Sequence, residues 1–406
     1  MVFFGWKVVA TASVVATCSF GFGYFGPAVF LSVLHTQHRW PVSLISAAIS
    51  LHFLVSALLV PRLPDAHERL GIAPVTLAGI IALQLGVLGW SLAAAPWQLF
   101  VASLLSGAGW AAAGSAAIIA MVSPWFDRRR ALALGLALNG ASIGGIVFAP
   151  LWVLVIAAAG FADAVAILGA VTLVALAPLI WRHLRPTPQS LQLAPDGAVG
   201  SAPPHRDAFG HVPPMRAASF VRSRPFITLA AASALGMFAQ VGITAHIVMR
   251  LVPLIDTQYA AGSISLTTAC AMIGRILLGL LLGRADRRLV AALNFVTQAC
   301  GVSLLALGST PFVLVLGCVL FGLGIGSLLL LPPLIAQSDF PPADVPRVVA
   351  LVTAVNQAVF AFAPAFLGVL REFAGDYALP FLVAAGLQLL ASLIVVLGRT
   401  PMRRLR

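Results

Sequence analysis

The chain of 406 residues is 60% apolar and only 9% charged, with a formal net charge of +12. Soluble domains carry about 25% charged residues, so the composition excludes an ordinary soluble protein and indicates a membrane protein. The four cysteines all lie within apolar stretches and form no Cys/His cluster. We therefore expect no disulfide framework, no metal and no cofactor.

Uncharged stretches recur along the whole chain, and an α-helix needs about 20 apolar residues to cross a bilayer. In chain order they cover residues 8–38, 40–61, 70–126, 131–162, 164–181, 225–249, 289–338, 348–370 and 377–398. The stretches 70–126 and 289–338 are each long enough for two helices. Together with the apolar segment 260–283, the pattern predicts an all-α membrane protein with twelve transmembrane helices.

The basic residues predict the orientation of these helices. If the N-terminus is cytosolic, 20 of the 24 Lys and Arg residues fall in cytosolic segments; Arg39, Arg250 and Arg371 fall outside, and Arg275 falls within the membrane. The positive-inside rule therefore favours a multi-pass protein of the cell (inner) membrane with both termini in the cytoplasm. A basic cytosolic face near anionic lipid explains the net charge without a nucleic-acid partner.

Three pairs of motifs indicate an internal repeat. Asp65 and Asp286 follow similar helix ends, Gly107-Ala-Gly109 matches Gly322-Leu-Gly324, and Asn139 matches Asn356, at spacings of 221, 215 and 217 residues. The segment between the two copies is rich in Pro, Arg and Ser, which is typical of a linker. We expect an N-terminal six-helix bundle at 1–182, a cytosolic linker at 183–224 and a C-terminal six-helix bundle at 225–406.

A duplicated six-helix unit with a long central loop resembles the major facilitator superfamily, whose substrate site lies between the two halves. Residues 283–287 and, less closely, 61–71 are similar to the loop motif G-x-x-x-D-R-x-G-R of that family. The resemblance implies that these loop charges latch an inner gate, and we expect a charged pair before the fifth helix to join them. The gating residues would then be Asp65, Arg69, Asp127, Arg128, Asp286 and Arg287. The alternative is that they are solvated loop residues that only set the topology.

A narrower resemblance rests on the run from Trp125 to Gly144. Its aromatic-Phe pair, basic cluster, Ala-x-Gly and Gly-x-Ser-x-Gly elements are similar to a run of the monocarboxylate and oxalate–formate transporter family. Three further short motifs support this resemblance: Gly5-Trp6, Trp40-x-x-Ser43 and Gly274-Arg275. The resemblance implies a carboxylate substrate that is bound by Arg275.

The position of Arg275 supports the same interpretation. Counted back from Asp286 along a helix, it lies about 16 Å deep, in a hydrocarbon core about 30 Å thick. None of the twelve acidic residues lies inside a span, so the missing counter-ion could be the substrate. The alternative is that the guanidinium binds backbone carbonyls or reaches the cytosolic interface.

Three features depart from the family pattern. Ala271 stands one turn before the arginine, where animal members carry an Asp, and segment 18–34 lacks the Lys that they carry in the first helix. Asn356 and Gln357 stand where oxalate exchangers carry a basic residue. One membrane cation suits a monoanion better than a dianion, and the family's proton relay does not carry over unchanged.

Other polar residues in apolar spans complete the predicted site. His246 or His52 could carry a proton beside the anion, because imidazole titrates near neutral pH; the alternative is a neutral His bonded to backbone or Ser. Buried amides need partners, so Asn139 and Asn356 either line the cavity or bond across helices. Tyr24 either lines the cavity or packs between helices. The expected substrate-binding residues are Arg275, His246, Asn139, Asn356, Gln357, Tyr24 and His52.

The membrane spans contain no pair of carboxylates, nucleotide-binding loop or Ser-His-Asp arrangement, which argues against an enzyme. We expect a secondary active transporter of a small organic monoanion, a monocarboxylate above all, coupled to protons or to exchange of another anion. The alternative is an efflux pump for hydrophobic or cationic compounds, which usually needs a membrane carboxylate. We expect a monomer in the lipid bilayer.

Overall fold

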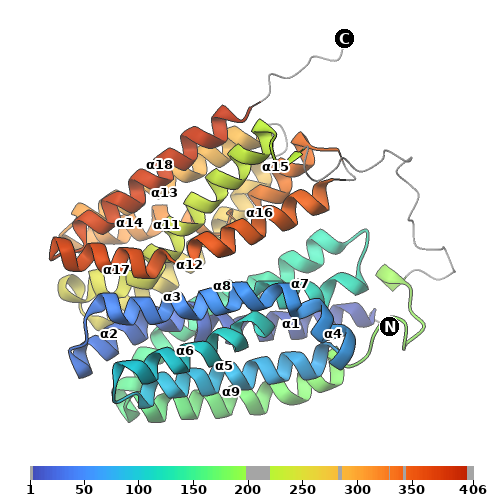
Figure 1. Ribbon diagram of the computed structural model, residues 1–406, viewed down its shortest axis with the longest axis horizontal. Helices are drawn as coiled ribbons and strands as arrows, with labels where there is room; N and C mark the ends of the chain where they lie inside the picture. The colour runs from blue at the N-terminus through green and yellow to red at the C-terminus, as the bar shows by residue number, and fades with distance from the viewer. Residues whose placement is uncertain (1–2, 198–219, 282–285, 329, 342–343, 400–406) are drawn as a thin grey trace. The chain divides into compact units, whose positions relative to one another are not determined.

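The computed structural model describes residues 3–197, 220–281, 286–328, 330–341 and 344–399 (Figure 1). These residues form helices joined by short connections, with no strand among them. Eleven helical segments in this part of the chain are long and apolar enough to cross a membrane, and a further apolar helix, Pro311–Ile325, is shorter. The predicted all-α membrane fold is confirmed, and the shorter helix stands where the tenth span was expected.

The chain forms two compact units, which we call the N-terminal and C-terminal units. The N-terminal unit comprises Met1–Ala202 with Thr244–Ser265, and the C-terminal unit comprises Pro203–Ile243 with Leu266–Arg406. The division falls inside the two helices α11 (Arg224–Ile255) and α12 (Thr257–Leu281). The domain boundaries expected at 182 and 225 stay a prediction.

The N-terminal unit is built on long helices that pack lengthwise. In chain order they are α1 (Phe4–Phe20), η1 (Gly21–Phe25), α2 (Gly26–His38), α3 (Val42–Leu59), α4 (Leu63–Leu70), α5 (Ile72–Leu92), α6 (Pro96–Ala113), α7 (Ser115–Val122), α8 (Arg130–Ala159) and α9 (Phe161–Leu184). Short 3-10 turns lie at η2 (Val60–Arg62), η3 (Ser123–Trp125) and η4 (Pro195–Gly197). Helix α5 packs against α6 and α9, α3 packs against α6, and α1 packs against α8.

Six helices of the described part of the chain lie wholly within the C-terminal unit. They are α13 (Arg287–Leu307), α14 (Pro311–Ile325), α15 (Leu331–Asp339), α16 (Val345–Phe360), α17 (Ala363–Ala374) and α18 (Ala378–Leu397). Parts of α11 and α12 also belong to this unit. Helix α13 packs against both α14 and α18.

Close helix crossings recur in the two units at a constant spacing of 215 residues. A side chain at Gly107 of α6 would overlap the carbonyl oxygen of His52, and one at Gly322 of α14 would overlap the carbonyl oxygen of Thr267. A second pair of crossings keeps the same spacing: Gly86 on Ser106 and Gly301 on Phe321. Small residues allow helix backbones to approach closely in membranes. The repeat indicated by the motifs therefore appears as the same backbone contacts in each unit.

The fourth and tenth spans are both interrupted. Helix α6 ends at Ala113, Gly114 is extended, and α7 follows. Helix α14 ends at Ile325, and α15 begins at Leu331 with prolines in its first turn, where the missing N–H groups cost no helical hydrogen bond. Each interruption leaves a helix end, with its unpaired backbone groups, inside an apolar segment.

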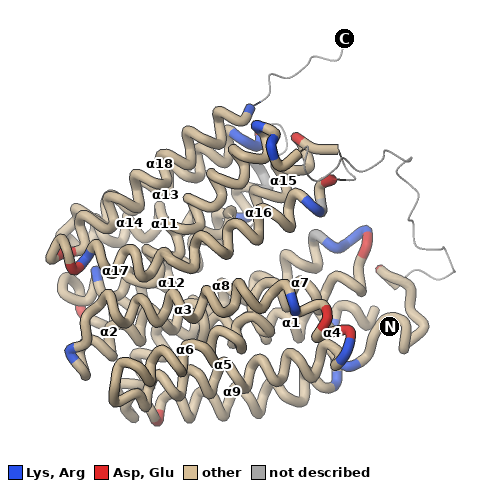
Figure 2. The backbone as a smooth tube through the Cα atoms, in the orientation of Figure 1, with Lys and Arg blue, Asp and Glu red and all other residues tan. Residues whose placement is uncertain are grey.

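Charged residues avoid the middles of the helices. Figure 2 shows Lys, Arg, Asp and Glu gathered at helix ends and in connecting segments, with long uncharged stretches between them. This distribution follows from the cost of placing charge in hydrocarbon. A charge in a helix interior, such as that of Arg275, therefore needs a specific explanation.

Candidate functional site

Arg275 lies on α12, about two turns before the last residue of the helix. Its Nε donates to the carbonyl oxygen of Ala271, one turn earlier, at a long 3.4 Å. The side chain is partly buried, whereas Ile276 and Leu277 beside it are exposed. The polar side chain therefore points away from the most exposed face of the helix.

Helix α14 lies directly against the arginine. A side chain at Gly274 would overlap the carbonyl oxygen of Leu323, so the two helix backbones touch there. A Cβ atom at Gly326 would lie 2.8 Å from Nε and 2.9 Å from Cγ of Arg275. The side chain of Arg275 therefore lies close to the end of α14.

His246 is fully buried in the N-terminal unit, on the part of α11 that belongs to it. Its Nε2 lies 3.3 Å from the hydroxyl of Ser46 on α3, which is also buried. A serine partner is the arrangement expected for the neutral alternative, and it is also compatible with a proton carrier because hydroxyls both donate and accept.

His52 lies in an aromatic setting of the N-terminal unit. Its Nδ1 is 2.9 Å from the hydroxyl of Ser106, and its ring contacts Phe53 and Trp110. The side chain is 1% exposed. Tyr24, on the π-helical turn η1, stacks near Trp110 with ring centroids 6.5 Å apart. The hydroxyl and the two rings hold His52 in one orientation, and its role in substrate or proton binding stays a prediction.

The amides lie in both units. Asn139 is half-buried on α8 of the N-terminal unit. Asn356 is buried on α16 of the C-terminal unit, next to the half-buried Gln357. The Oδ1 of Asn356 has no hydrogen-bond partner among the described residues. A buried carbonyl without a partner is costly, so this atom is available to a ligand or a water.

The predicted substrate-binding residues thus divide between the units. The N-terminal unit contains Tyr24, His52, Asn139 and His246; the C-terminal unit contains Arg275, Asn356 and Gln357. Within the N-terminal unit, Tyr24 and His52 share the neighbour Trp110. That all seven line one cavity stays a prediction.

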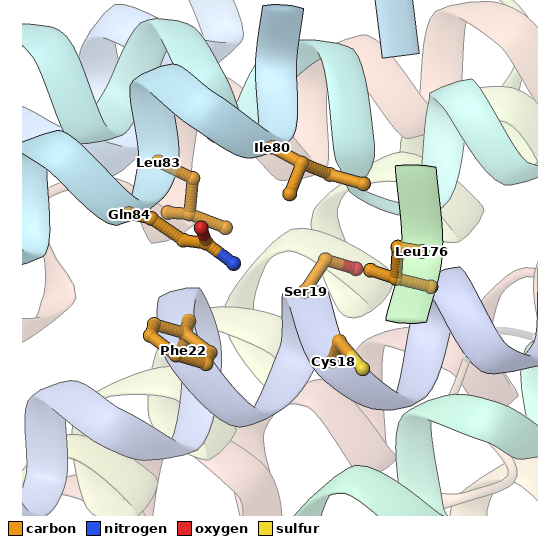
Figure 3. A pocket seen from close by; sticks show the side chains of 7 residues that line it. All are labelled: Cys18, Ser19, Phe22, Ile80, Leu83, Gln84 and Leu176. Atoms are coloured by element: carbon orange, nitrogen blue, oxygen red, sulfur yellow. The ribbon is translucent and has the colours of Figure 1, made fainter. Parts of the chain in front are cut away.

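Figure 3 shows a small hollow in the N-terminal unit, with an empty volume of about 180 Å³ that includes its opening. It is lined by Cys18, Ser19, Phe22, Ile80, Leu83, Gln84 and Leu176. None of the predicted substrate-binding residues is among them. It lies between α1, α5 and α9, and its apolar lining does not suit an anion.

The predicted gating residues of the N-terminal unit are exposed. Asp65 and Arg69 lie on α4, and Asp127 and Arg128 lie in the turn before α8. In the C-terminal unit, Arg287 donates to the carbonyl oxygen of Leu334 on α15. Their assignment to a gate stays a prediction.

Asp286 caps the N-terminus of α13. It accepts hydrogen bonds from the backbone of Arg288 and Leu289 and from Nε of Arg399, at 2.8 Å for the last. Partial burial raises the pKa of Asp286, but the hydrogen bonds and the charge of Arg399 outweigh it, so the net pKa is below the ordinary value. The carboxylate is therefore charged at neutral pH and holds the chain after α18.

We expect Asp286→Asn to lower the maximal rate of transport severalfold, with less than a twofold change in KM. Asn still caps a helix but cannot pair with Arg399, so the balance of conformations changes more than substrate binding does. Initial uptake rates over a range of substrate concentrations measure both constants. Asp376→Asn, at a different helix start, is the matched control. An unchanged maximal rate with a large rise in KM would contradict a gating role.

Sequence reasoning missed Asp196, which it placed only in the linker. The carboxylate accepts hydrogen bonds from three successive backbone N–H groups, of Asp127, Arg128 and Arg129, at 2.7–3.3 Å. Partial burial raises the pKa of Asp196, but these hydrogen bonds and the charge of Arg129 outweigh it, and the net pKa is lowered. The start of the linker is thereby fastened to the turn that contains two predicted gating residues.

We expect Asp196→Asn to speed hydrogen exchange at the amides of residues 127–129 severalfold, because the charged acceptor is lost. In the unchanged protein the protection should persist at neutral pH and disappear as the pH falls through the lowered pKa of Asp196. Mass-spectrometric exchange on peptides covering this turn measures the effect, with Asp163→Asn as control. Unchanged exchange in Asp196→Asn would show that the carboxylate does not hold the turn.

Arg288 was also missed as a structural centre. It is 3% exposed and pairs with Asp339 at 2.7 Å. It also donates to Thr228 Oγ1 and to the carbonyl oxygens of Pro225 and Val395. These partners join α11, α13, α15 and α18 within the C-terminal unit. The sequence offered only an Asp-Arg-Arg triplet as a signal.

The described residues contain no group of three or more His, Cys, Asp or Glu side chains that could hold a metal ion. The predicted substrate-binding residues themselves offer a guanidinium, imidazoles, amides and a phenol hydroxyl.

Comparison with known proteins identifies the family. A model of the Major Facilitator Superfamily matches residues 12–364. Monocarboxylate transporter 13 of Bos taurus is 28% identical over 404 residues, which cover 97% of this chain and 88% of that protein. Monocarboxylate transporter 11 of Homo sapiens is 28% identical over 347 residues, which cover 81% and 69%.

Solved structures agree on the fold. The nucleoside transporter NupG has a TM-score of 0.74 at 15% identity, over 98% of this chain and 100% of that one. A bacterial homologue of the human lysosomal transporter Spinster has a TM-score of 0.70 at 14% identity, over 96% of each chain. These identities show the fold alone. The match over most of its length places this chain in the major facilitator superfamily, as a multi-pass membrane transporter rather than an enzyme.

Proposed function

We propose that the chain is a secondary active transporter that moves a small organic monoanion, a monocarboxylate, by alternating access. The observation that carries the proposal is Arg275, a cation in the interior of an apolar helix. Neither α12 nor α14, which packs against it, contains an acidic residue. An anionic substrate would supply the charge that these helices lack.

The relatives support the substrate class. Two curated proteins similar to this chain over most of its length are named monocarboxylate transporters. A planar guanidinium binds a carboxylate through two parallel hydrogen bonds, which gives direction as well as affinity. The unpartnered Oδ1 of Asn356, on the same unit as Arg275, is a candidate acceptor for a hydroxyl or a protonated group of the substrate.

Two forms of coupling fit the site. In proton symport, His246 or the substrate would take up the proton, and Ser46 would accept or donate to the imidazole in either protonation state. In anion exchange, return of the empty carrier would be disfavoured because Arg275 would stay without an anion. The two forms differ in whether a pH gradient or an internal anion drives uptake.

The test is uptake into proteoliposomes with a panel of labelled monocarboxylates of two to six carbons, a dicarboxylate and a hydrophobic cation. We expect uptake of at least one monocarboxylate, competition by other monocarboxylates and little effect of the dicarboxylate. An inward pH gradient should stimulate symport, whereas preloaded anion should stimulate exchange. Transport of the cation but of no monocarboxylate would contradict the proposal and favour an efflux pump.

A further inference from the structure

The tenth span is interrupted at the point where it meets Arg275. Helix α14 ends at Ile325, and Gly326 forms its C-cap. The next residues leave the α-helix in a series of turns, in which Ser327 N–H bonds to the carbonyl of Gly324 and Leu328 N–H to that of Ile325. A Cβ atom at Gly326 would lie 2.8 Å from Nε and 2.9 Å from Cγ of the arginine, so the side chain of Arg275 fills the space beside this glycine.

A helix C-terminus carries a partial negative charge, because its last carbonyl groups point out of the helix and lack intrahelical partners. Cations are stabilised there, and the effect is stronger in partly buried surroundings. The end of α14 therefore offers Arg275 a fixed, partial counter-charge. Such a partial charge is smaller than the full charge of a carboxylate.

Gly322 of α14 and Gly326, the C-cap of that helix, both face α12, but only Gly326 meets the arginine. A side chain at Gly322 would overlap the carbonyl of Thr267 and approach Cβ of Cys270. A side chain at Gly326 would overlap the carbonyl of Ala271 and would also approach the Arg275 side chain. Gly322 is thus a control that shares the helix crossing but not the contact with Arg275.

We propose that Gly326 is the positioning residue of Arg275. Because Gly326 has no side chain, the guanidinium can lie against the C-terminal end of α14. The partial negative charge of this helix end stabilises the cation, and the contact orients the guanidinium toward the substrate. The consequence for transport rests on the proposed function, in which Arg275 binds the carboxylate. The contact between Gly326 and Arg275 does not depend on that function.

A double-mutant cycle on thermal stability tests the contact without any substrate. The variants are Gly326→Ala and Gly322→Ala, each with and without Arg275→Ala, in purified detergent-solubilised protein. We expect the loss of melting temperature caused by Gly326→Ala to be at least twice as large when Arg275 is present as when it is absent. The loss caused by Gly322→Ala should be the same in both backgrounds.

Failure to fold is also informative in this cycle. Recovery of Gly326→Ala only in combination with Arg275→Ala would support the proposal. The proposal would be overturned if Gly326→Ala lowered the melting temperature equally with and without Arg275, or if the protein failed to fold in both cases. The overlap with the Ala271 carbonyl would then be sufficient to explain why position 326 is a glycine.

Transport supplies the second readout. We expect Gly326→Ala to raise KM for a transported monocarboxylate about tenfold, while Gly322→Ala changes KM less than twofold at matched expression. A structural role alone would lower the amount of active protein without changing KM. If Arg275→Ala keeps a normal KM, the proposed function is wrong, but the double-mutant cycle on melting temperature still tests whether Gly326 and Arg275 interact. If Arg275→Ala loses the substrate but Gly326→Ala shows neither coupling nor a higher KM, the positioning role fails alone.

Discussion

Replacement of Arg275 with alanine is expected to lower monocarboxylate uptake at low substrate concentration by about 30-fold or more. Removing one partner of a buried, hydrogen-bonded charge pair costs about 2–5 kcal/mol, and each 1.4 kcal/mol corresponds to a factor of ten. The protein should still fold, because removing a charged side chain from an apolar helix relieves its desolvation cost. Uptake into proteoliposomes with matched amounts of protein measures the effect.

Arg275→Lys separates charge from geometry. Lysine keeps the positive charge but loses the planar fork, so we expect uptake to fall steeply in this variant as well. Arg347→Ala, which removes an exposed arginine of the same unit, is the control and should transport normally. A well-folded Arg275→Ala carrier with a near-normal KM would contradict the role of Arg275.

Replacement of Arg288 with methionine is expected to cause the largest loss of stability. Methionine fills part of the space but leaves Asp339 and two backbone carbonyls without the partner that they have in the C-terminal unit. Breaking a buried ion pair by removing one partner costs about 3–5 kcal/mol. We expect a markedly lower melting temperature and low yield of monodisperse protein, measured by size exclusion after heating.

Arg224→Ala is the control for this prediction, since Arg224 is an exposed arginine on the same helix as Thr228 and Pro225. Its melting temperature should remain close to that of the unchanged protein. Asp339→Asn should have an intermediate effect, because the carbonyl and hydroxyl partners of Arg288 remain. A normal melting temperature for Arg288→Met would show that the network does not hold the unit together.

Hydrophobic patterning and charge were sufficient to predict the helices and the repeat. Apolar length and the bias of Lys and Arg residues are strong signals because hydrocarbon imposes a large cost on exposed charge and on unpaired backbone groups. The spacing of 215 residues between Gly107 and Gly322 recurs in a second pair of helix crossings, at Gly86 and Gly301. The interruption of the tenth span could not be placed, since its sequence is apolar on both sides of the break.

The parts of the candidate site that sequence reasoning missed depend on contacts between distant residues. Arg288 and Asp339 are 51 residues apart, and Asp196 and Arg128 are 68 residues apart. Nothing local distinguishes them from other loop charges. Gly326 is similar, because small residues are common in membrane helices and only the fold shows which one meets an arginine.

His52 and His246, in contrast, were recognised from the sequence, but their roles were not. Both were recognised as unusual polar residues in apolar helices, yet sequence alone could not separate a proton carrier from a buried structural residue. The structure gives each a serine partner, Ser106 for His52 and Ser46 for His246. Both side chains are buried to a similar extent, so a proton-carrying role for either stays a prediction.

The most direct test of the account is ligand binding to the purified carrier, measured as thermal stabilisation. The ligands are the best-transported monocarboxylate of the uptake panel and its carboxamide, which has nearly the same shape but no charge. A ligand that binds only the folded state raises the melting temperature in a concentration-dependent way. We predict that the carboxylate stabilises the unchanged protein, that the carboxamide does not, and that Arg275→Ala responds to neither. Equal stabilisation of Arg275→Ala by the carboxylate, or of the unchanged protein by the carboxamide, would contradict the central role of Arg275.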